Sequence, residues 1–232
     1  MELIGEGLAR AFRLVAGGDA EVLGITWLSL QVSAAATGLA LLVGMPLGAA
    51  LALIRFPGRA LVVALVNTGM GLPPVVVGLF VSILLWRSGP LGFLELLYTP
   101  TAIVIAQLVI ALPMVMGLTI AAVQQIDPRL SLQLLGLGAS RGQLLLLLLR
   151  EARLPLLAAV MAGFGAVISE VGASLMVGGN ILHHTRVLTT ATVLETAKGN
   201  FDVAIALSLI LLAITFVINL ALTLVQQRAR PE

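Results

Sequence analysis

The sequence predicts an all-α polytopic membrane protein with about five transmembrane helices, preceded by an amphipathic helix. Two observations support this fold class. Of the 232 residues, 59% are hydrophobic and only 10% are charged, whereas roughly a quarter of the residues of a soluble domain are charged. The few charges also divide the chain into uncharged runs long enough to cross a bilayer core of about 30 Å.

Residues 1–20 are predicted to form an interfacial amphipathic helix. Apolar residues recur at helical spacing and charged residues fall on the other faces. The apolar set is Ile4, Leu8, Phe12 and Val15, and the charged set is Glu2, Glu6, Arg10 and Arg13. A helix of this pattern lies in the plane of the membrane surface. A cleavable signal peptide is not predicted, because acids occupy the place of its basic start.

Residues 21–226 are predicted to form a single transmembrane domain, since no linker or repeat divides them. Four uncharged runs lie at 22–54, 60–86, 96–126 and 203–227. A fifth span is predicted from Leu154 to about Val177, interrupted only by Glu170. The first run is longer than a span needs, so we expect a tilt or a kink at Pro46.

The basic residues orient these spans, because Lys and Arg concentrate on the cytoplasmic side. An odd number of spans places the two ends of the chain on opposite sides. One side then holds Arg55, Arg59, Arg129, Arg141, Arg150, Arg153, Arg228 and Arg230, and the other holds Arg10, Arg13, Arg87, Arg186 and Lys198. We therefore expect the N-terminus outside and the C-terminus in the cytoplasm. The same rule accounts for the basic pI of 9.9, so no nucleic-acid partner is expected.

Glu170 is the only charged residue inside a predicted span. Burying a carboxylate in lipid costs at least about 2.5 kcal/mol, so its side chain must face protein, water or a partner. Small residues recur around it, which favours a close helix contact. They are Ala158, Ala162, Ala166 and Ser174 in one stripe, and Gly165, Ser169 and Ala173 in a second. Glu170 is either a gate or proton-relay residue, or a structural acid that caps backbone groups near 178–180. The lack of a partner base favours the structural role.

A backbone break is predicted inside the second run, at 69–74. Two prolines remove two backbone donors and force the preceding residue out of helical geometry. Such a break at membrane depth is tolerated only where it is buried in protein or lines a cavity. An ordinary proline kink is equally compatible with the pattern. The candidate pathway or gate residues are Asn67, Thr68, Gly71, Leu72, Pro73 and Pro74, together with Ser169 and Glu170.

Motifs for catalysis and metal binding are absent from the sequence. There is no phosphate-binding GxxxxGK[ST] loop, no HExxH and no cysteine, and His183 and His184 stand alone. Paired histidines without a third ligand make a poor metal site. We therefore expect neither an enzyme nor a resident metal or cofactor.

The segment between the third and fourth spans, residues 126–153, carries the most specific pattern. It contains Ile126-Asp127-Pro128-Arg129-Leu130 and then Leu137-Gly138-Ala139-Ser140-Arg141. A helix begun by proline, a glycine turn and a second short helix would form a compact projection. This order resembles the coupling loop of ABC importer permeases, in which Ile-Asp-Pro leads to Glu-Ala-Ala and Leu-Gly-Ala-Ser. The candidate ATPase-coupling residues are therefore Asp127, Pro128, Gly138, Ala139, Ser140 and Arg141.

The loop also departs from the family pattern. Leu132, Gln133 and Leu134 occupy the Glu-Ala-Ala positions, so the characteristic acid is missing. The expected Leu-Pro lies one turn later, at Leu154-Pro155. The resemblance nevertheless continues from about Thr26 to Asn219. Residues 71–74 resemble the proline break of oxyanion permeases, and 169–173 resemble their Gly-Glu-Phe-Gly-Ala; the likeness is strongest to the tungstate type.

The resemblance implies a type I ABC importer permease in the inner membrane. It implies a homodimer that works with two cytoplasmic ATPase subunits, which carry ATP and Mg, and with an extracytoplasmic substrate-binding protein. The implied cargo is an oxyanion, tungstate or molybdate, and Glu170 is expected not to touch it. The alternatives are an ABC permease for another anion such as sulfate, a proton-coupled secondary transporter with Glu170 as carrier, and a membrane scaffold.

Overall fold

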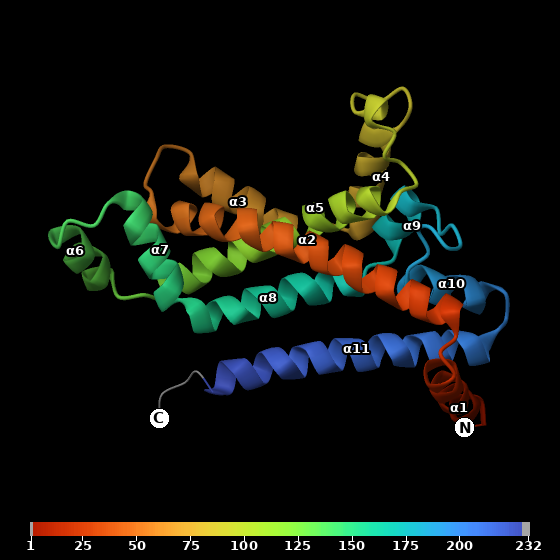
Figure 1. Ribbon diagram of the computed structural model, residues 1–232. Helices are drawn as coiled ribbons and strands as arrows, with labels where there is room; N and C mark the ends of the chain where they lie inside the picture. Colours follow the sequence, from red (N-terminus) through yellow and green to blue (C-terminus); the bar gives the residue numbers. More distant parts are fainter. Residues whose placement is uncertain (1, 229–232) are drawn as a thin grey trace.

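Four long helices run side by side through the body of the protein, as the computed structural model shows (Figure 1). The structure describes residues 2–228, among which no strand occurs. The long helices are α2 (Ala20–Leu53), α5 (Pro100–Gln124), α8 (Arg153–Ile168) and α11 (Phe201–Arg228). The shorter elements are α1 (Glu2–Ala16), α3 (Arg59–Met70), α4 (Pro74–Leu85), η1 (Gly92–Leu94), α6 (Pro128–Gly136), α7 (Arg141–Glu151), α9 (Gly172–Gly178) and α10 (Leu188–Ala197). The predicted all-α class is confirmed.

The predicted number of spans is confirmed in a modified form. Among residues 2–228, the helices α2, α5 and α11 are each long and apolar enough to cross a membrane. Two bent helix pairs complete a set of up to five spans. The chain bends by 104° between α3 and α4, and by 56° between α8 and α9. If each bent pair is counted as one span, two of the five spans are broken helices; α4 stands away from the bundle in Figure 1.

The α3–α4 break lies where the prolines predict it. Gly71 ends α3, Pro73 is extended at φ −61° and ψ 125°, and Pro74 is the first residue of α4. Proline fits the first helical turn because its missing N–H would have no partner there. The same residue type inside α2, Pro46, leaves a single helix of 34 residues.

The α8–α9 break corrects one expectation. The small-residue stripes suggested one helix through Glu170, but α8 ends at Ile168 and α9 begins at Gly172. The stripes are therefore interrupted before Glu170 and Ser174. The physical reason lies in Glu170 itself, whose carboxylate accepts hydrogen bonds from the Ala173 and Ser174 amides in the first turn of α9 and so begins a new helix.

The two ends of the bundle carry different elements. Helices α6 and α7 lie at the end that α11 reaches last, and α1, α9 and α10 lie at the other (Figure 1). The N- and C-terminal helices thus finish at opposite ends, as an odd number of spans requires. Which end faces the cytoplasm stays a prediction. Arg230 lies outside the described residues.

A helix is present where an interfacial helix was predicted. Helix α1 packs against α11, with Gly7 directly on Ile205 and an Arg10–Asp202 ion pair of 2.7 Å. Leu8 and Phe12 are exposed. The side chains of Glu2, Ile4, Glu6 and Val15 lie outside the described part of the chain. That this helix lies on a membrane surface stays a prediction.

Candidate functional site

Glu170 lies buried at the α8–α9 break and caps the start of α9. Its Oε1 accepts a hydrogen bond from the Ala173 amide at 2.8 Å. Its Oε2 accepts from the Ser174 amide at 2.8 Å and from the Ser174 hydroxyl at 2.9 Å. A carboxylate that accepts several such bonds at a helix start is stabilised by them and by the helix dipole. This geometry supports the structural role, although at Ala173 and Ser174 rather than near residues 178–180.

Further polar side chains hold the same break from neighbouring helices. Thr189 of α10 donates its hydroxyl to the Glu170 carbonyl at 2.8 Å. Gln107 of α5 donates from Nε2 to the Val167 carbonyl at 3.1 Å and to the Ser174 hydroxyl at 3.4 Å. All four side chains of this network are buried, so their hydrogen bonds are shielded from water.

Sequence reasoning missed two members of this network. Gln107 is an amide side chain in the middle of the uncharged run 96–126, far from Gln124 and Gln125 at its end, and this position is the signal that could have found it. Thr189 carries no comparable signal, because threonines are frequent in that segment and only the fold brings this one to Glu170.

The two helix breaks lie against each other. A Cβ on Gly172 would come within 2.6 Å of a methyl group of Val75, the second residue of α4. One turn further on, a Cβ on Gly78 would come within 2.6 Å of the Ala173 Cα. Helices α4 and α9 therefore pack backbone to backbone directly beyond their breaks.

The predicted pathway residues of the α3–α4 break lie on the surface of the chain. Asn67, Thr68, Gly71, Leu72, Pro73 and Pro74 are all exposed, and Ser169 is exposed beside the other break. The hydroxyls of Thr68 and Ser169 donate to carbonyls of their own helices at 2.8 and 2.7 Å. The structure thus brings the two breaks together but separates exposed Ser169 from buried Glu170.

The segment 126–153 forms the predicted two-helix projection. Asp127 accepts from the Arg129 amide at 2.8 Å and so begins α6, with Pro128 as its first residue. Gly138 adopts a left-handed φ of +86° in the turn. Ser140 begins α7 by exchanging hydrogen bonds with Gln143, and Arg141 is the first residue of that helix. Ala139 lies between them.

Apolar side chains cover the outside of this projection. Leu132 is 69% exposed and Leu137 is 85% exposed, and no residue of α6 is buried. A cavity of about 510 Å³ lies behind them, lined by Leu130, Leu134, Leu147, Leu154 and the charged Arg150, Glu151 and Arg153. Neighbouring exposed leucines of this kind are typical of a contact surface for another protein.

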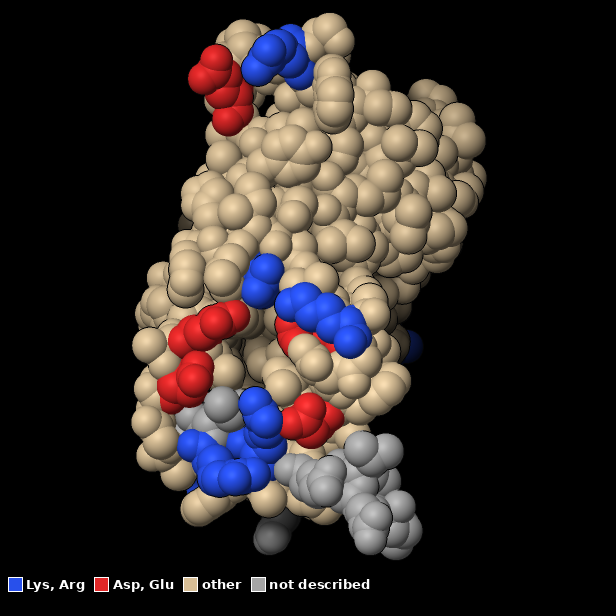
Figure 2. Space-filling model, turned by 90° about the vertical axis from the view of Figure 1, so that its right-hand side faces the viewer, with Lys and Arg blue, Asp and Glu red and all other residues tan. Residues whose placement is uncertain are grey.

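The opposite end of the bundle carries paired charges. Figure 2 shows blue and red side chains gathered over the lower part of this end, while most of the remaining face is uncharged. The ion pairs here are Arg10–Asp202, Arg186–Glu21 and Lys198–Glu195. Among the described residues of this end, the basic side chains Arg10, Arg186 and Lys198 are therefore each paired with an acid.

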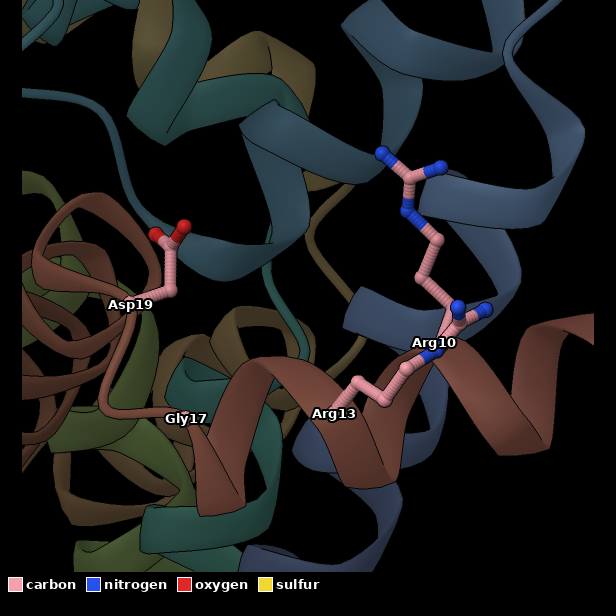
Figure 3. A pocket seen from close by; sticks show the side chains of 4 residues that line it. All are labelled: Arg10, Arg13, Gly17 and Asp19. Atoms are coloured by element: carbon pink, nitrogen blue, oxygen red, sulfur yellow. The ribbon is translucent and has the colours of Figure 1, made fainter.

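A hollow of about 340 Å³ between α1 and α2 is lined by Arg10, Arg13, Gly17 and Asp19. Figure 3 shows that the three charged side chains extend in different directions rather than toward one point. Each also has a partner: Arg10 binds Asp202, Arg13 donates to the Ala9 carbonyl, and Asp19 caps α2 at Val22. The hollow is therefore not arranged as an anion site.

Metal-binding groups do not converge in the part of the chain that the structure describes. No three His, Asp or Glu side chains there lie close enough to hold an ion. His183 and His184 lie in the turn between α9 and α10.

Comparison with known proteins places these features in a family. The family model described as "Binding-protein-dependent transport system inner membrane component" matches residues 44–231. A tungstate uptake system permease protein of Peptoclostridium acidaminophilum is 40% identical over 98% of this chain and 100% of its own length. A Campylobacter jejuni protein of the same name is 36% identical over 71% of this chain and 69% of its own. A Haloferax volcanii protein named "Probable anion ABC transporter permease protein" is 43% identical over 84% of this chain and 86% of its own.

Proposed function

The chain belongs to the family of binding-protein-dependent transport system inner membrane components, and from this premise we propose that it is the permease of a tungstate importer. It is an inner-membrane ABC permease of the anion type. The family implies an ATPase and a binding protein as partners. The observation that carries the tungstate proposal is the 40% identity, over nearly the whole chain, to a tungstate uptake permease.

Residues 126–153, here called the coupling segment, are the proposed contact with two ATPase subunits, which would bind ATP and Mg. Its two helices are begun independently by Asp127-Pro128 and by Ser140, so the projection keeps its shape without the missing acid at Leu132. The exposed Leu132 and Leu137 supply an apolar contact. Burial of such side chains in a partner groove would remove apolar surface from water, which favours association.

The pathway is proposed to run along the α3–α4 break and Ser169, between two copies of the chain. The break residues are exposed on a single chain, whereas a non-helical backbone at membrane depth must face protein or a cavity. A second copy would enclose them. ATP binding would draw the coupling segments together and open this pathway to the binding protein.

Glu170 is proposed to stabilise the gate by holding the start of α9, without contacting the cargo. Its negative charge would repel a dianion, but three hydrogen bonds turn the carboxylate toward the start of α9. Neutral hydroxyl and amide groups near the break would then meet the anion. Discrimination among tungstate, molybdate and sulfate would lie in the binding protein, because these ions share shape and charge.

We also propose the predicted two-part organisation. Residues 1–20 would lie on the outer membrane surface, and 21–226 would form one permease domain with its C-terminus in the cytoplasm. The exposed Leu8 and Phe12 on α1 support the first part. The clustering of α6, α7 and the end of α11 at one end of the bundle supports the second.

Reconstitution tests the proposal. The chain would be purified with its ATPase, inserted into liposomes and supplied with the binding protein and radioactive tungstate. We expect uptake that requires ATP and the binding protein and survives a protonophore. Uptake driven by a proton gradient without the ATPase would instead establish a secondary transporter. Unlabelled molybdate or sulfate that competes more strongly than tungstate would reassign the cargo.

A further inference from the structure

Gln107 spans the α8–α9 break with a single side-chain amide. Its Nε2 donates to the Val167 carbonyl at the end of α8 and to the Ser174 hydroxyl in α9. The Ser174 hydroxyl in turn donates a hydrogen bond to Oε2 of Glu170 at 2.9 Å. A side chain from a third helix therefore contacts both sides of the break and the acid between them.

Helix α5, which carries Gln107, is suited to serve as a fixed support for the α8–α9 break. Helix α5 is one unbroken span that packs against α2, α3, α4, α8 and α9. Gln107 itself is 2% exposed and lies between the buried residues Ile103 and Ala111 of its own helix. A change in the angle between α8 and α9 would therefore strain one or both of the Gln107 hydrogen bonds.

Packing alone does not account for a glutamine at this position. Its Oε1 is buried and has no hydrogen-bond partner among the described residues. An unsatisfied buried acceptor costs free energy, whereas an apolar side chain of the same length would not carry that cost. The two donated hydrogen bonds are therefore the property that distinguishes glutamine from methionine here.

We propose that Gln107 is a positioning residue of the gate, which sets the angle between α8 and α9 without touching the transported anion. Gln107 holds the angle found in this structure, and the ATP-driven rearrangement works against its two hydrogen bonds. Loss of the bridge lets α9 change its angle without nucleotide, so that ATP hydrolysis is no longer tied to the binding protein. This inference rests on the proposed function as an ABC importer.

The test uses the full transporter with Gln107→Met, which keeps the side-chain length and removes both donors and the unsatisfied acceptor. Thr119→Val is the matched control, because Thr119 is a fully buried residue of the same helix whose hydroxyl has no partner among the described residues. We expect Gln107→Met to assemble with the ATPase but to reduce the stimulation of ATP hydrolysis by the binding protein roughly five- to a hundredfold. Thr119→Val keeps the stimulation.

A spin-label distance reports the angle directly. The chain has no cysteine, so Ala158→Cys and Leu175→Cys, both at exposed positions on α8 and α9, carry the only labels. Labelled chains diluted with unlabelled ones report the distance within one chain. We expect a narrow nucleotide-free distribution for the otherwise native chain and a broad one for Gln107→Met.

Ser174→Ala is a second test, because it removes the hydrogen bond that Gln107 makes to α9 and leaves the bond to Val167 in place; it also removes the bond from the Ser174 hydroxyl to Glu170. Since the two residues act through one bond, the double variant should lose less than the sum of the single losses. Additive losses, or native stimulation and a native distance in Gln107→Met, overturn the inference. If Gln107→Met does not assemble, native stimulation in Ser174→Ala overturns it equally. Absence of ATP-dependent uptake by the native chain refutes the proposed function instead.

Discussion

Gly78 of α4 packs directly on the backbone of Ala173 of α9, so closely that a Cβ on Gly78 would lie 2.6 Å from the Ala173 Cα. A real Cβ does not approach a backbone atom so closely. The contact joins the helices that follow the two breaks, α4 and α9. The two helices can therefore move together but cannot be spread apart without losing this packing.

Gly78→Ala is expected to separate α4 from α9. The added methyl group meets backbone rather than a flexible side chain, so one helix must shift, at about 1 to 3 kcal/mol. Thermal unfolding of the purified permease should occur at a lower temperature than in the native chain. Gly165→Ala in α8 is the control, since nothing lies within 4 Å of its Cβ position; its unfolding temperature should be unchanged or higher. Equal unfolding temperatures for the two variants would contradict the close contact.

Glu195, near the end of α10, is expected to make the free energy of unfolding depend on pH. Hydrogen bonds from Asn200 and then Lys198, at 2.7 and 2.8 Å, hold the pKa of this carboxyl below its ordinary value. A lowered folded-state pKa contributes stability above the unfolded-state pKa and loses it as pH falls through the folded-state pKa. Glu195→Gln should therefore unfold more easily than the native chain at neutral pH, by less than about 1 kcal/mol. Below the folded-state pKa of Glu195 the difference in stability between the two chains should vanish. A difference that stays constant from neutral pH to below this pKa would contradict the stabilising role of the Glu195 carboxylate.

The sequence predicts the elements of this fold better than their arrangement. Uncharged runs locate the spans and the two prolines locate the α3–α4 break, because both are local properties of the chain. The α8–α9 break was harder to place, since the residues 169–171 have ordinary helix-compatible side chains. It depends on hydrogen bonds that Glu170 makes with the next turn and that Gln107 makes from 60 residues away. Such long-range contacts leave no periodic trace in the sequence.

The coupling segment illustrates the same difference. Its caps are local, so Asp127 and Ser140 predict both helix starts. Its surface is not local: the exposure of Leu137 follows from the way α6 and α7 extend from the bundle. The candidate coupling residues that resemblance supplies are mainly those that shape the projection, and the structure adds the apolar residues that such a projection presents.

Leu137→Ser is expected to weaken ATPase binding without unfolding the permease. Leu137 is 85% exposed, so its replacement costs little in the isolated chain, whereas a leucine at the centre of an interface contributes about 1 to 2 kcal/mol. The ATPase should therefore bind roughly five- to thirtyfold more weakly, as measured by titration in detergent. Phe93→Ser is the matched control, because Phe93 is 75% exposed in η1, which follows α4. A loss of ATPase affinity only in Phe93→Ser would place the coupling surface elsewhere.

Glu170 offers the sharpest separation between a structural acid and a residue of the anion route. Glu170→Ala leaves two backbone amides and a hydroxyl of α9 without their acceptor, and each unpaired buried group costs about 1 to 3 kcal/mol. Glu170→Gln keeps the shape and one acceptor oxygen but sets an NH2 group against a backbone donor. We therefore expect the unfolding temperature to fall in both variants, and further in Glu170→Ala.

The substrate dependence of transport then decides the role of this carboxylate. In Glu170→Gln that has assembled with its ATPase, the tungstate–binding-protein concentration for half-maximal uptake should stay within about twofold of native, because a group that does not contact the cargo does not change its binding. The uptake should remain insensitive to a protonophore. A large change in this concentration with normal assembly would instead place Glu170 on the route of the anion. Proton-dependent uptake in the native chain that Glu170→Gln abolishes would make it a proton carrier.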